Sequence, residues 1–174
     1  NVRNALAAAA CAHALRIAPD TIAEGLAAFS PARGRLVRTR ATGGADLIDD
    51  TYNANPDSVR AAIDVLADCA APRVLVLGDM GEVGDEGPRF HREVGEYAAQ
   101  RGVAHLLALG EAARDSVDAF GPAGEWFADI DLLKARAAAL AQPGATVLVK
   151  GSRFMRMERV AAALSGAAIS GGAH

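Results

Sequence analysis

Short apolar runs alternate along most of the chain with segments in which apolar residues recur every three or four positions. The runs predict buried strands, and the periodic segments predict amphipathic helices, such as the one that would place Val59, Ile63 and Leu66 on a common face. We expect strands at 36–40, 45–49, 73–78, 104–109, 125–128 and 146–150, and helices at 56–70, 88–100, 111–119, 131–141 and 155–164. The first two strands, joined through Thr42-Gly43-Gly44, would form a hairpin or another tight connection. This alternation predicts an α/β fold: an open, mostly parallel sheet with helices on both faces.

Two helices, predicted at 2–16 and 19–29, precede the first strand. After them, the segment from Ser30 to Arg35 contains a proline and a glycine, which makes it the best candidate for a domain boundary. We expect a helical unit at 1–33, a main domain at 34–164 and a flexible tail, rich in Gly, Ala and Ser, at 165–174. Because the chain opens on Asn1 within a helical pattern, we also expect it to be cut from a longer protein.

The composition suits a globular protein that acts on small molecules. The chain has 174 residues, of which 51% are apolar, so it can bury a core. Its 18 basic and 21 acidic residues are interspersed and provide no basic surface for nucleic acid. No apolar run approaches the roughly 20 residues that span a bilayer, and no secretory signal opens the sequence. We therefore expect no nucleic-acid or membrane partner and a cytoplasmic location.

Three common binding signatures are missing from the sequence. Cys11 and Cys69 lack the spacing of a zinc site or redox pair, so we predict no metal site and expect both cysteines to be buried. The glycine-rich loop that grips the β- and γ-phosphates of ATP does not occur, and no strand is followed by the dinucleotide fingerprint. A nucleotide site in this chain would therefore be a partial one.

The most informative polar segment is Asp49 to Ser58, which follows an apolar strand and opens a helix. Ligands of α/β sheets bind beyond the carboxyl ends of the strands, which is where this segment lies. Asp50 could accept hydrogen bonds from ribose hydroxyls, while Asn53 and Asn55 could bind the edge of a purine. The alternative is an Asx-rich turn that caps the next helix.

A second polar loop, Leu77 to Gly84, also follows a predicted strand. Its glycines would let the backbone approach a ligand, and Asp79 and Glu82 offer charges to an amine or a bound cation. The alternative is a flexible turn. His91, one turn into the next helix, could donate to a carboxylate or carry a proton, or could be structural.

The third polar loop, at the end of the last strand, contains Lys150, Ser152 and Arg153. If a helix begins there, two cations and backbone donors meet at its N-terminus and form an anion site for a carboxylate or phosphate. The alternative is that both cations line a solvated strand end. We interpret Met155 and Met157 as packing residues.

Three motifs, in this order and at these separations, carry a family resemblance: Asp-Asp-Thr-Tyr-Asn-Ala-Asn-Pro at 49–56, Gly-Asp-Met-Gly-Glu-Val-Gly at 78–84 and Val-Lys-Gly-Ser-Arg at 149–153. Together with Gly34-Arg35 and His91, they resemble the C-terminal domain of the Mur ligases, over about residues 1 to 164. The resemblance implies a Rossmann-like domain, with the first two helices belonging to the end of the family's central ATPase domain.

The resemblance further implies an ATP-dependent amide ligase of peptidoglycan precursor synthesis, acting on UDP-N-acetylmuramoyl-tripeptide and D-alanyl-D-alanine through an acyl phosphate. By analogy with the family, the contacts to ATP would be Arg35, Asp50, Asn53 and Asn55, supported by Tyr52. Residues facing the dipeptide and the reaction centre would be Asp79, Met80, Glu82, His91, Lys150, Ser152 and Arg153, with His91 a candidate catalytic group. Mg²⁺ would bind mainly through the central domain, so we expect this chain alone to be inactive. The resemblance also implies domain closure, which predicts a hinge around Ser30 to Gly34. A polar cleft that closes between domains also predicts a monomer.

Other functions stay open at this point. One is another amide ligase of the same superfamily, acting on a different amino acid or on folate. A second is a non-catalytic nucleotide-binding module. A dinucleotide oxidoreductase is disfavoured because the glycine fingerprint is missing.

Overall fold

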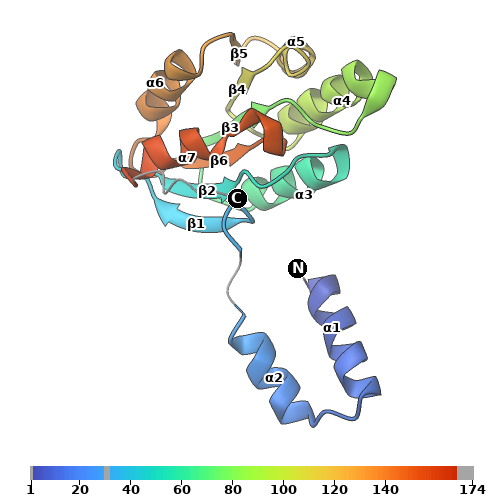
Figure 1. Cartoon of the computed structure of the whole chain (residues 1–174). Helices are drawn as coiled ribbons and strands as arrows, with labels where there is room; N and C mark the ends of the chain where they lie inside the picture. Colours follow the sequence, from blue (N-terminus) through green and yellow to red (C-terminus); the bar gives the residue numbers. More distant parts are fainter. Residues whose placement is uncertain (1, 30–31, 168–174) are drawn as a thin grey trace. The chain divides into compact units, whose positions relative to one another are not determined.

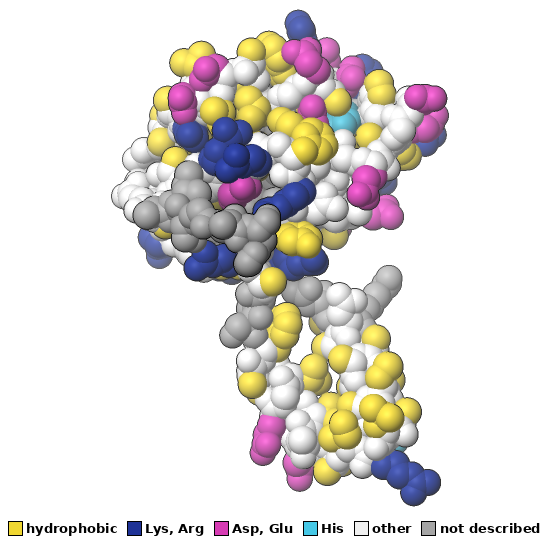
Figure 2. All heavy atoms as spheres, in the orientation of Figure 1, with side chains coloured by type: hydrophobic (Ala, Val, Ile, Leu, Met, Phe, Trp, Pro, Cys, Tyr) yellow, Lys and Arg dark blue, Asp and Glu magenta, His cyan; other side chains and the backbone are white. Residues whose placement is uncertain are grey.

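The computed structural model describes residues 2–29 and 32–167 and divides the chain into two compact units, Asn1–Ala32 and Arg33–His174. Ser30 and Pro31 of the predicted hinge, and residues 168–174 of the predicted tail, lie outside the described residues. The smaller unit contains the helices α1 (Val2–Ala14) and α2 (Pro19–Ala27). No described side chain of either helix is buried, and Figure 2 shows many hydrophobic side chains on their surface.

Six strands form one sheet in the larger unit, in the order β1-β2-β6-β3-β4-β5 (Figure 1). Only β1 runs antiparallel to its neighbour, β2, and the other pairs are parallel. The bounds are β1 (Val37–Arg40), β2 (Asp46–Asp50), β3 (Arg73–Gly78), β4 (His105–Leu109), β5 (Gly124–Phe127) and β6 (Thr146–Lys150). The predicted fold class and the hairpin are confirmed.

Two groups of helices cover the two faces of the sheet. One face packs against α3 (Pro56–Ala67), α4 (Gly87–Gln100) and α5 (Arg114–Phe120), and the other against α6 (Ile130–Leu140) and α7 (Glu158–Ser165). Alternation along β3 supplies both cores, since Val74 and Val76 belong to the α6–α7 side and Leu75 and Leu77 to the α3–α4 side. Both faces of the central strands are therefore buried, as their continuous apolar runs predict.

The order of the strands determines at which point neighbouring loops lead to opposite faces of the sheet. From β2 through β3 and β4 to β5, the connecting helices lie on one face, and α6 then returns on the other face to β6, which lies between β2 and β3. The loops after β2 and β3 therefore lead to one side of the sheet, and the segment after β6 leads to the other. In open α/β sheets the crevice at such a point is where ligands bind.

A surface contact joins α3 to α4 and affects the titration of Tyr97. The Tyr97 hydroxyl donates to Asp64 Oδ1 over 2.7 Å, and Arg101 Nε lies 2.9 Å from the same oxygen. The hydrogen bond to Asp64, with smaller contributions from desolvation and the Asp64 charge, raises the pKa of the Tyr97 phenol above its ordinary value of 10.0. The folded state thus holds this proton more tightly than the unfolded chain does. Its stabilising contribution is complete below pH 10.0 and is lost as the pH rises through the folded-state pKa.

We expect Asp64→Asn to lower the pKa of Tyr97, because the carboxylate that holds the phenol proton is removed. The absorbance of tyrosinate reports this in a Tyr52→Phe background, where Tyr97 is the only one of the chain's two tyrosines left. Asp57→Asn, an exposed substitution on the same helix, is the control and should leave the titration unchanged. Equal curves for Asp64→Asn and the control would contradict the contact.

Candidate functional site

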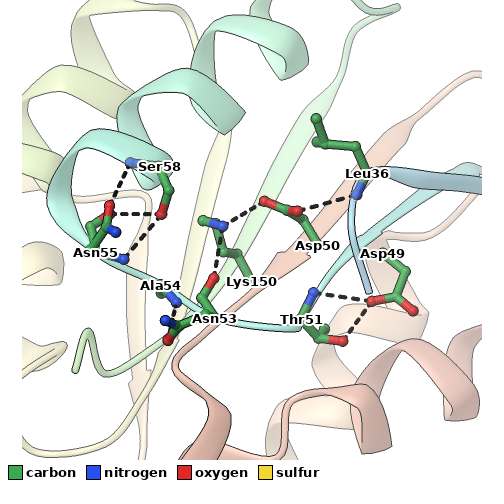
Figure 3. Close-up of polar contacts among 9 residues, drawn as sticks. All are labelled: Leu36, Asp49, Asp50, Thr51, Asn53, Ala54, Asn55, Ser58 and Lys150. Atoms are coloured by element: carbon green, nitrogen blue, oxygen red, sulfur yellow. Dashed lines mark hydrogen bonds and ion pairs between the residues drawn. The ribbon is translucent and has the colours of Figure 1, made fainter. Parts of the chain in front are cut away.

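Asp50 and Lys150 form a largely buried ion pair at the carboxyl ends of β2 and β6. The strand register places them side by side, and Lys150 Nζ lies 2.5 Å from Asp50 Oδ2 and 2.9 Å from the carbonyl oxygen of Asn53 (Figure 3). Asp50 Oδ1 accepts a hydrogen bond from the backbone N–H of Leu36 over 3.1 Å. Only 14% of the Asp50 side chain and 3% of the Lys150 side chain are exposed. The two residues that we expect to contact different ligands therefore contact each other, and the alternative of a solvated strand end is wrong for Lys150.

The remaining polar side chains of the β2–α3 loop make local hydrogen bonds. Asn55 caps α3: its Oδ1 accepts from Ser58 N–H over 2.8 Å, and its own N–H donates to Ser58 Oγ over 3.0 Å (Figure 3). Asn53 Oδ1 accepts from the N–H of Ala54 over 2.9 Å. The alternative of a helix-capping turn is confirmed for Asn55. Both amides are nonetheless exposed, so they can still reach a ligand.

Asp79 connects the loops after β3, β6 and β4. Its carbonyl oxygen accepts from the hydroxyl of Ser152 over 2.6 Å and from the backbone N–H of Ser152 over 3.0 Å. Its carboxylate accepts from the N–H of Ala113 over 2.7 Å. Gly110, at φ +107°, lies so close that a Cβ there would overlap the Asp79 carboxylate. Asp79 and Ser152 therefore hold loops together, and of the acids in this loop's motif only Glu82 is exposed.

Met80 and His91 are buried behind the same loop. Met80 is 3% exposed and packs in the core beneath α3 and α4. His91 is 0% exposed; its Nε2 lies 3.0 Å from Met80 N and its Nδ1 lies 2.8 Å from Gly87 O. The structural alternative for His91 is therefore confirmed, and the expectation that it donates to a carboxylate is wrong.

The turn after β6 does not open the long helix that we expect at 155–164. Residues 153–155 form one turn of 3-10 helix, Arg156 has φ +52°, and α7 begins only at Glu158. The left-handed residue breaks the helical path between Arg153 and α7. The expected α-helix N-terminus at this turn is therefore wrong, and binding of an anion by Arg153 stays a prediction. Within residues 2–29 and 32–167, no group of three or more His, Cys, Asp or Glu side chains could hold a metal ion.

The exposed part of the site is centred on Tyr52, which is 46% exposed. The guanidinium carbon of Arg35 lies 4.1 Å from the centre of the Tyr52 ring, and that of Arg153 lies 6.0 Å from it. These distances suit cation–π contacts. Tyr52 thus lies next to two arginines that are far apart in the sequence and are both exposed.

A groove of about 970 Å³ extends from Tyr52 between β1, β2 and α7. Its lining includes Arg153, Phe154 and Arg156, and Figure 2 shows Lys and Arg side chains gathered on the face of the larger unit that is in view. Sequence reasoning overlooked Phe154 and Arg156. Phe154 is 65% exposed although it is a large apolar residue. The run Arg-Phe-Met-Arg at 153–156, shortly after the end of a strand, was the sequence signal that could have identified both residues.

The family model for the Mur ligase, glutamate ligase domain matches residues 33–153. The chain belongs to this family. In Escherichia coli, UDP-N-acetylmuramoyl-tripeptide–D-alanyl-D-alanine ligase is 42% identical over 166 residues, which cover 94% of this chain and 36% of the relative. This Mur ligase chain therefore spans only about a third of the length of such relatives.

Solved structures support the same assignment. A crystal structure of MurF from Acinetobacter baumannii matches 95% of this chain and 37% of its own, with a TM-score of 0.85 and 35% identity. The MurF ligase from Thermotoga maritima, solved in complex with ADP, matches 81% of this chain and 32% of its own, with a TM-score of 0.71 and 26% identity.

In the described part of this Mur ligase chain, no helix has the length and apolar character that a membrane span requires. The expectation that Cys11 is buried is wrong, since it is exposed, and Cys69 is only partly buried.

Proposed function

We propose that this chain is the C-terminal part of an ATP-dependent ligase that adds D-alanyl-D-alanine to UDP-N-acetylmuramoyl-tripeptide in peptidoglycan precursor synthesis. The 42% identity to the Escherichia coli ligase of that name supports the choice of substrates. The observation that carries the proposal is the grouping of exposed Arg35, Tyr52 and Arg153 at the switch point of the sheet, where α/β proteins bind ligands.

Arg35, Tyr52, Asn53 and Asn55 form the nucleotide side of this site. A guanidinium can pair with phosphate oxygens, and the amides can bind the base or ribose. Asp50 acts indirectly: through Lys150 it fixes the carbonyl of Asn53 and so the loop that carries both amides. ATP supplies the phosphoryl group that activates the peptide carboxylate as an acyl phosphate.

Glu82 and Arg153 form the dipeptide side. Both are exposed, and their opposite charges suit the ammonium and carboxylate groups of D-alanyl-D-alanine. The amine must lose a proton before it attacks the acyl carbon, and the amide forms as phosphate leaves. Asp79, Met80, Ser152 and His91 hold the two loops that carry Glu82 and Arg153.

We assign α1 and α2 (residues 1–33) to the end of a preceding ATPase domain, residues 34–164 to the C-terminal domain and 165–174 to a tail. The exposed apolar side chains of the helices support this, since Leu6 is 64% and Leu15 77% exposed. The phosphate loop and most of the Mg²⁺ ligands would then lie in the preceding domain. The chain alone should therefore not catalyse ligation, and the complete ligase would work as a cytoplasmic monomer.

A backbone amide NMR titration tests the two sides separately. A non-hydrolysable ATP analogue should shift Arg35 and residues 52–55, and D-alanyl-D-alanine should shift residues near Glu82 and Arg153. Arg35→Ala should weaken nucleotide binding about tenfold, the loss of one charge-assisted contact, whereas Arg40→Ala, an exposed arginine of β1 paired with Asp46, should not. Nucleotide binding without any dipeptide response would favour the nucleotide-binding module. Equal effects of Arg35→Ala and Arg40→Ala would contradict the assigned nucleotide side.

A further inference from the structure

The loop between β3 and α4 adopts a backbone conformation that it would not prefer in isolation. Glu82 has φ +59° and Gly84 has φ +54°, and the left-handed region is unfavourable for a glutamate. A residue keeps such a conformation only where its surroundings determine it. Contacts of the neighbouring residues must therefore hold the loop.

Three sets of contacts hold the start of the loop. Asp79 is bound to Ser152 and Ala113, as described above, and Gly81 N–H donates to the carbonyl of Ala54 over 3.2 Å. Met80 lies between these two anchors, and its N–H points to His91 Nε2 over 3.0 Å. His91 is thus the contact that comes from α4, whereas Ser152 belongs to the segment after β6.

The backbone partners determine the tautomer of His91. The N–H of Met80 can only donate, so Nε2 must accept with its lone pair. The ring proton is then on Nδ1, which donates to the carbonyl of Gly87 over 2.8 Å. Both ring nitrogens are used and the side chain is fully buried, so neither can contact a ligand.

We propose that His91 is a positioning residue: in its Nδ1–H tautomer it fixes Met80, and thereby presents Glu82 in its left-handed conformation to the incoming dipeptide. The role of Glu82 as a dipeptide contact rests on the proposed function. The His91–Met80 contact and its control over the loop do not depend on it.

Three substitutions at His91 separate the two hydrogen bonds. His91→Gln places an oxygen near the position of Nε2 and can still accept from Met80. His91→Asn keeps a polar group only near the position of Nδ1, and His91→Leu keeps neither. Gln and Asn share the same amide, so their comparison remains informative even if His91→Leu does not fold.

The first measurements are the exchange rate of the Met80 amide, the ¹⁵N shifts of the His91 ring and the three-bond coupling that reports φ at Glu82. We expect slow exchange, the Nδ1–H tautomer and positive φ in the unsubstituted chain and slow exchange in His91→Gln. In His91→Asn, Met80 should exchange about tenfold faster, as expected for one lost hydrogen bond, and Glu82 should lose its positive φ. Equal exchange and equal φ in the Gln and Asn variants would overturn the positioning role.

The second measurement is the affinity of each variant for D-alanyl-D-alanine. His91→Asn should bind about tenfold more weakly than His91→Gln. If the loop changes in His91→Asn but dipeptide affinity does not, the link to the dipeptide is overturned. If the unsubstituted chain shows the expected loop and tautomer but binds no dipeptide, the proposed function fails on the dipeptide side while the His91–Met80 coupling stands.

Discussion

Lys150→Met should destabilise the larger unit by about 3–5 kcal/mol, which is the usual effect of removing one partner from a buried ion pair. The substitution keeps an apolar stem of similar length but leaves the Asp50 carboxylate, with 14% of its side chain exposed, without its cation. It also removes the donor to the carbonyl of Asn53. Attraction between the two charges is only part of this effect, because most of the loss comes from leaving a desolvated carboxylate unpaired.

Urea unfolding followed by the fluorescence of Trp126 measures this effect, since the chain's single tryptophan lies in β5 of the larger unit. Lys134→Met is the matched control: its ion pair with Asp131 is 2.9 Å long but leaves 81% of the Asp131 side chain exposed. It should change stability by less than about 0.5 kcal/mol. A loss below about 1 kcal/mol for Lys150→Met would show that the pair is solvated.

A double substitution tests whether the unpaired Asp50 carboxylate accounts for the lost stability. Asn at position 50 can still accept from Leu36 N–H but carries no charge, so Lys150→Met with Asp50→Asn should recover half or more of the lost stability. No recovery would mean that the Asn53 carbonyl or the packing of the lysine stem, not the stranded carboxylate, accounts for the loss.

The strands were the most predictable part of this fold. β3 and β6 begin and end at the predicted residues because continuous Val/Leu runs are bounded by turns on both sides. The last helix was misplaced because Met155 and Arg156 continue a helical pattern in the sequence. Only the three-dimensional structure shows Arg156 in the left-handed region.

The sequence predicted a candidate site at the strand ends, but it did not predict which residues of that site contact one another. Polar residues at strand ends are typical both of ligand contacts and of contacts between neighbouring loops. Asp50 and Lys150 are 100 positions apart, and their contact depends on β6 lying next to β2, which no local pattern reveals. The same holds for Arg35 and Arg153, which meet only at the ring of Tyr52. Arg35 and Glu82 are exposed, whereas Lys150 is buried and Asp79 is partly buried. This difference can be known only from the three-dimensional structure.

Gly95→Ala should strongly destabilise the packing of α4 against α5. Gly95 faces α5, where an added Cβ would overlap the carbonyl oxygen of Ser116 and lie 2.8 Å from its carbonyl carbon and 2.9 Å from its Cα. These are backbone atoms, so the clash can be relieved only by moving one helix away from the other, at a cost of about 3 kcal/mol or more. The higher helix propensity of alanine returns only about 1 kcal/mol, so a net loss of about 2 kcal/mol or more is expected.

Gly87→Ala, in the first turn of the same helix, is the control, because the nearest atom to its added Cβ is the side-chain Cγ2 of Val83 at 3.3 Å. It should change stability by less than about 1 kcal/mol in the same urea experiment. Gly95 is one helical turn from His91, so a displacement of α4 should also lengthen the His91–Met80 hydrogen bond. Gly95→Ala should therefore speed exchange of the Met80 amide beyond the effect of its lower global stability. If Met80 exchange instead follows global stability in both variants, α4 does not shift near His91, and the clash with Ser116 is relieved by movement of α5 alone.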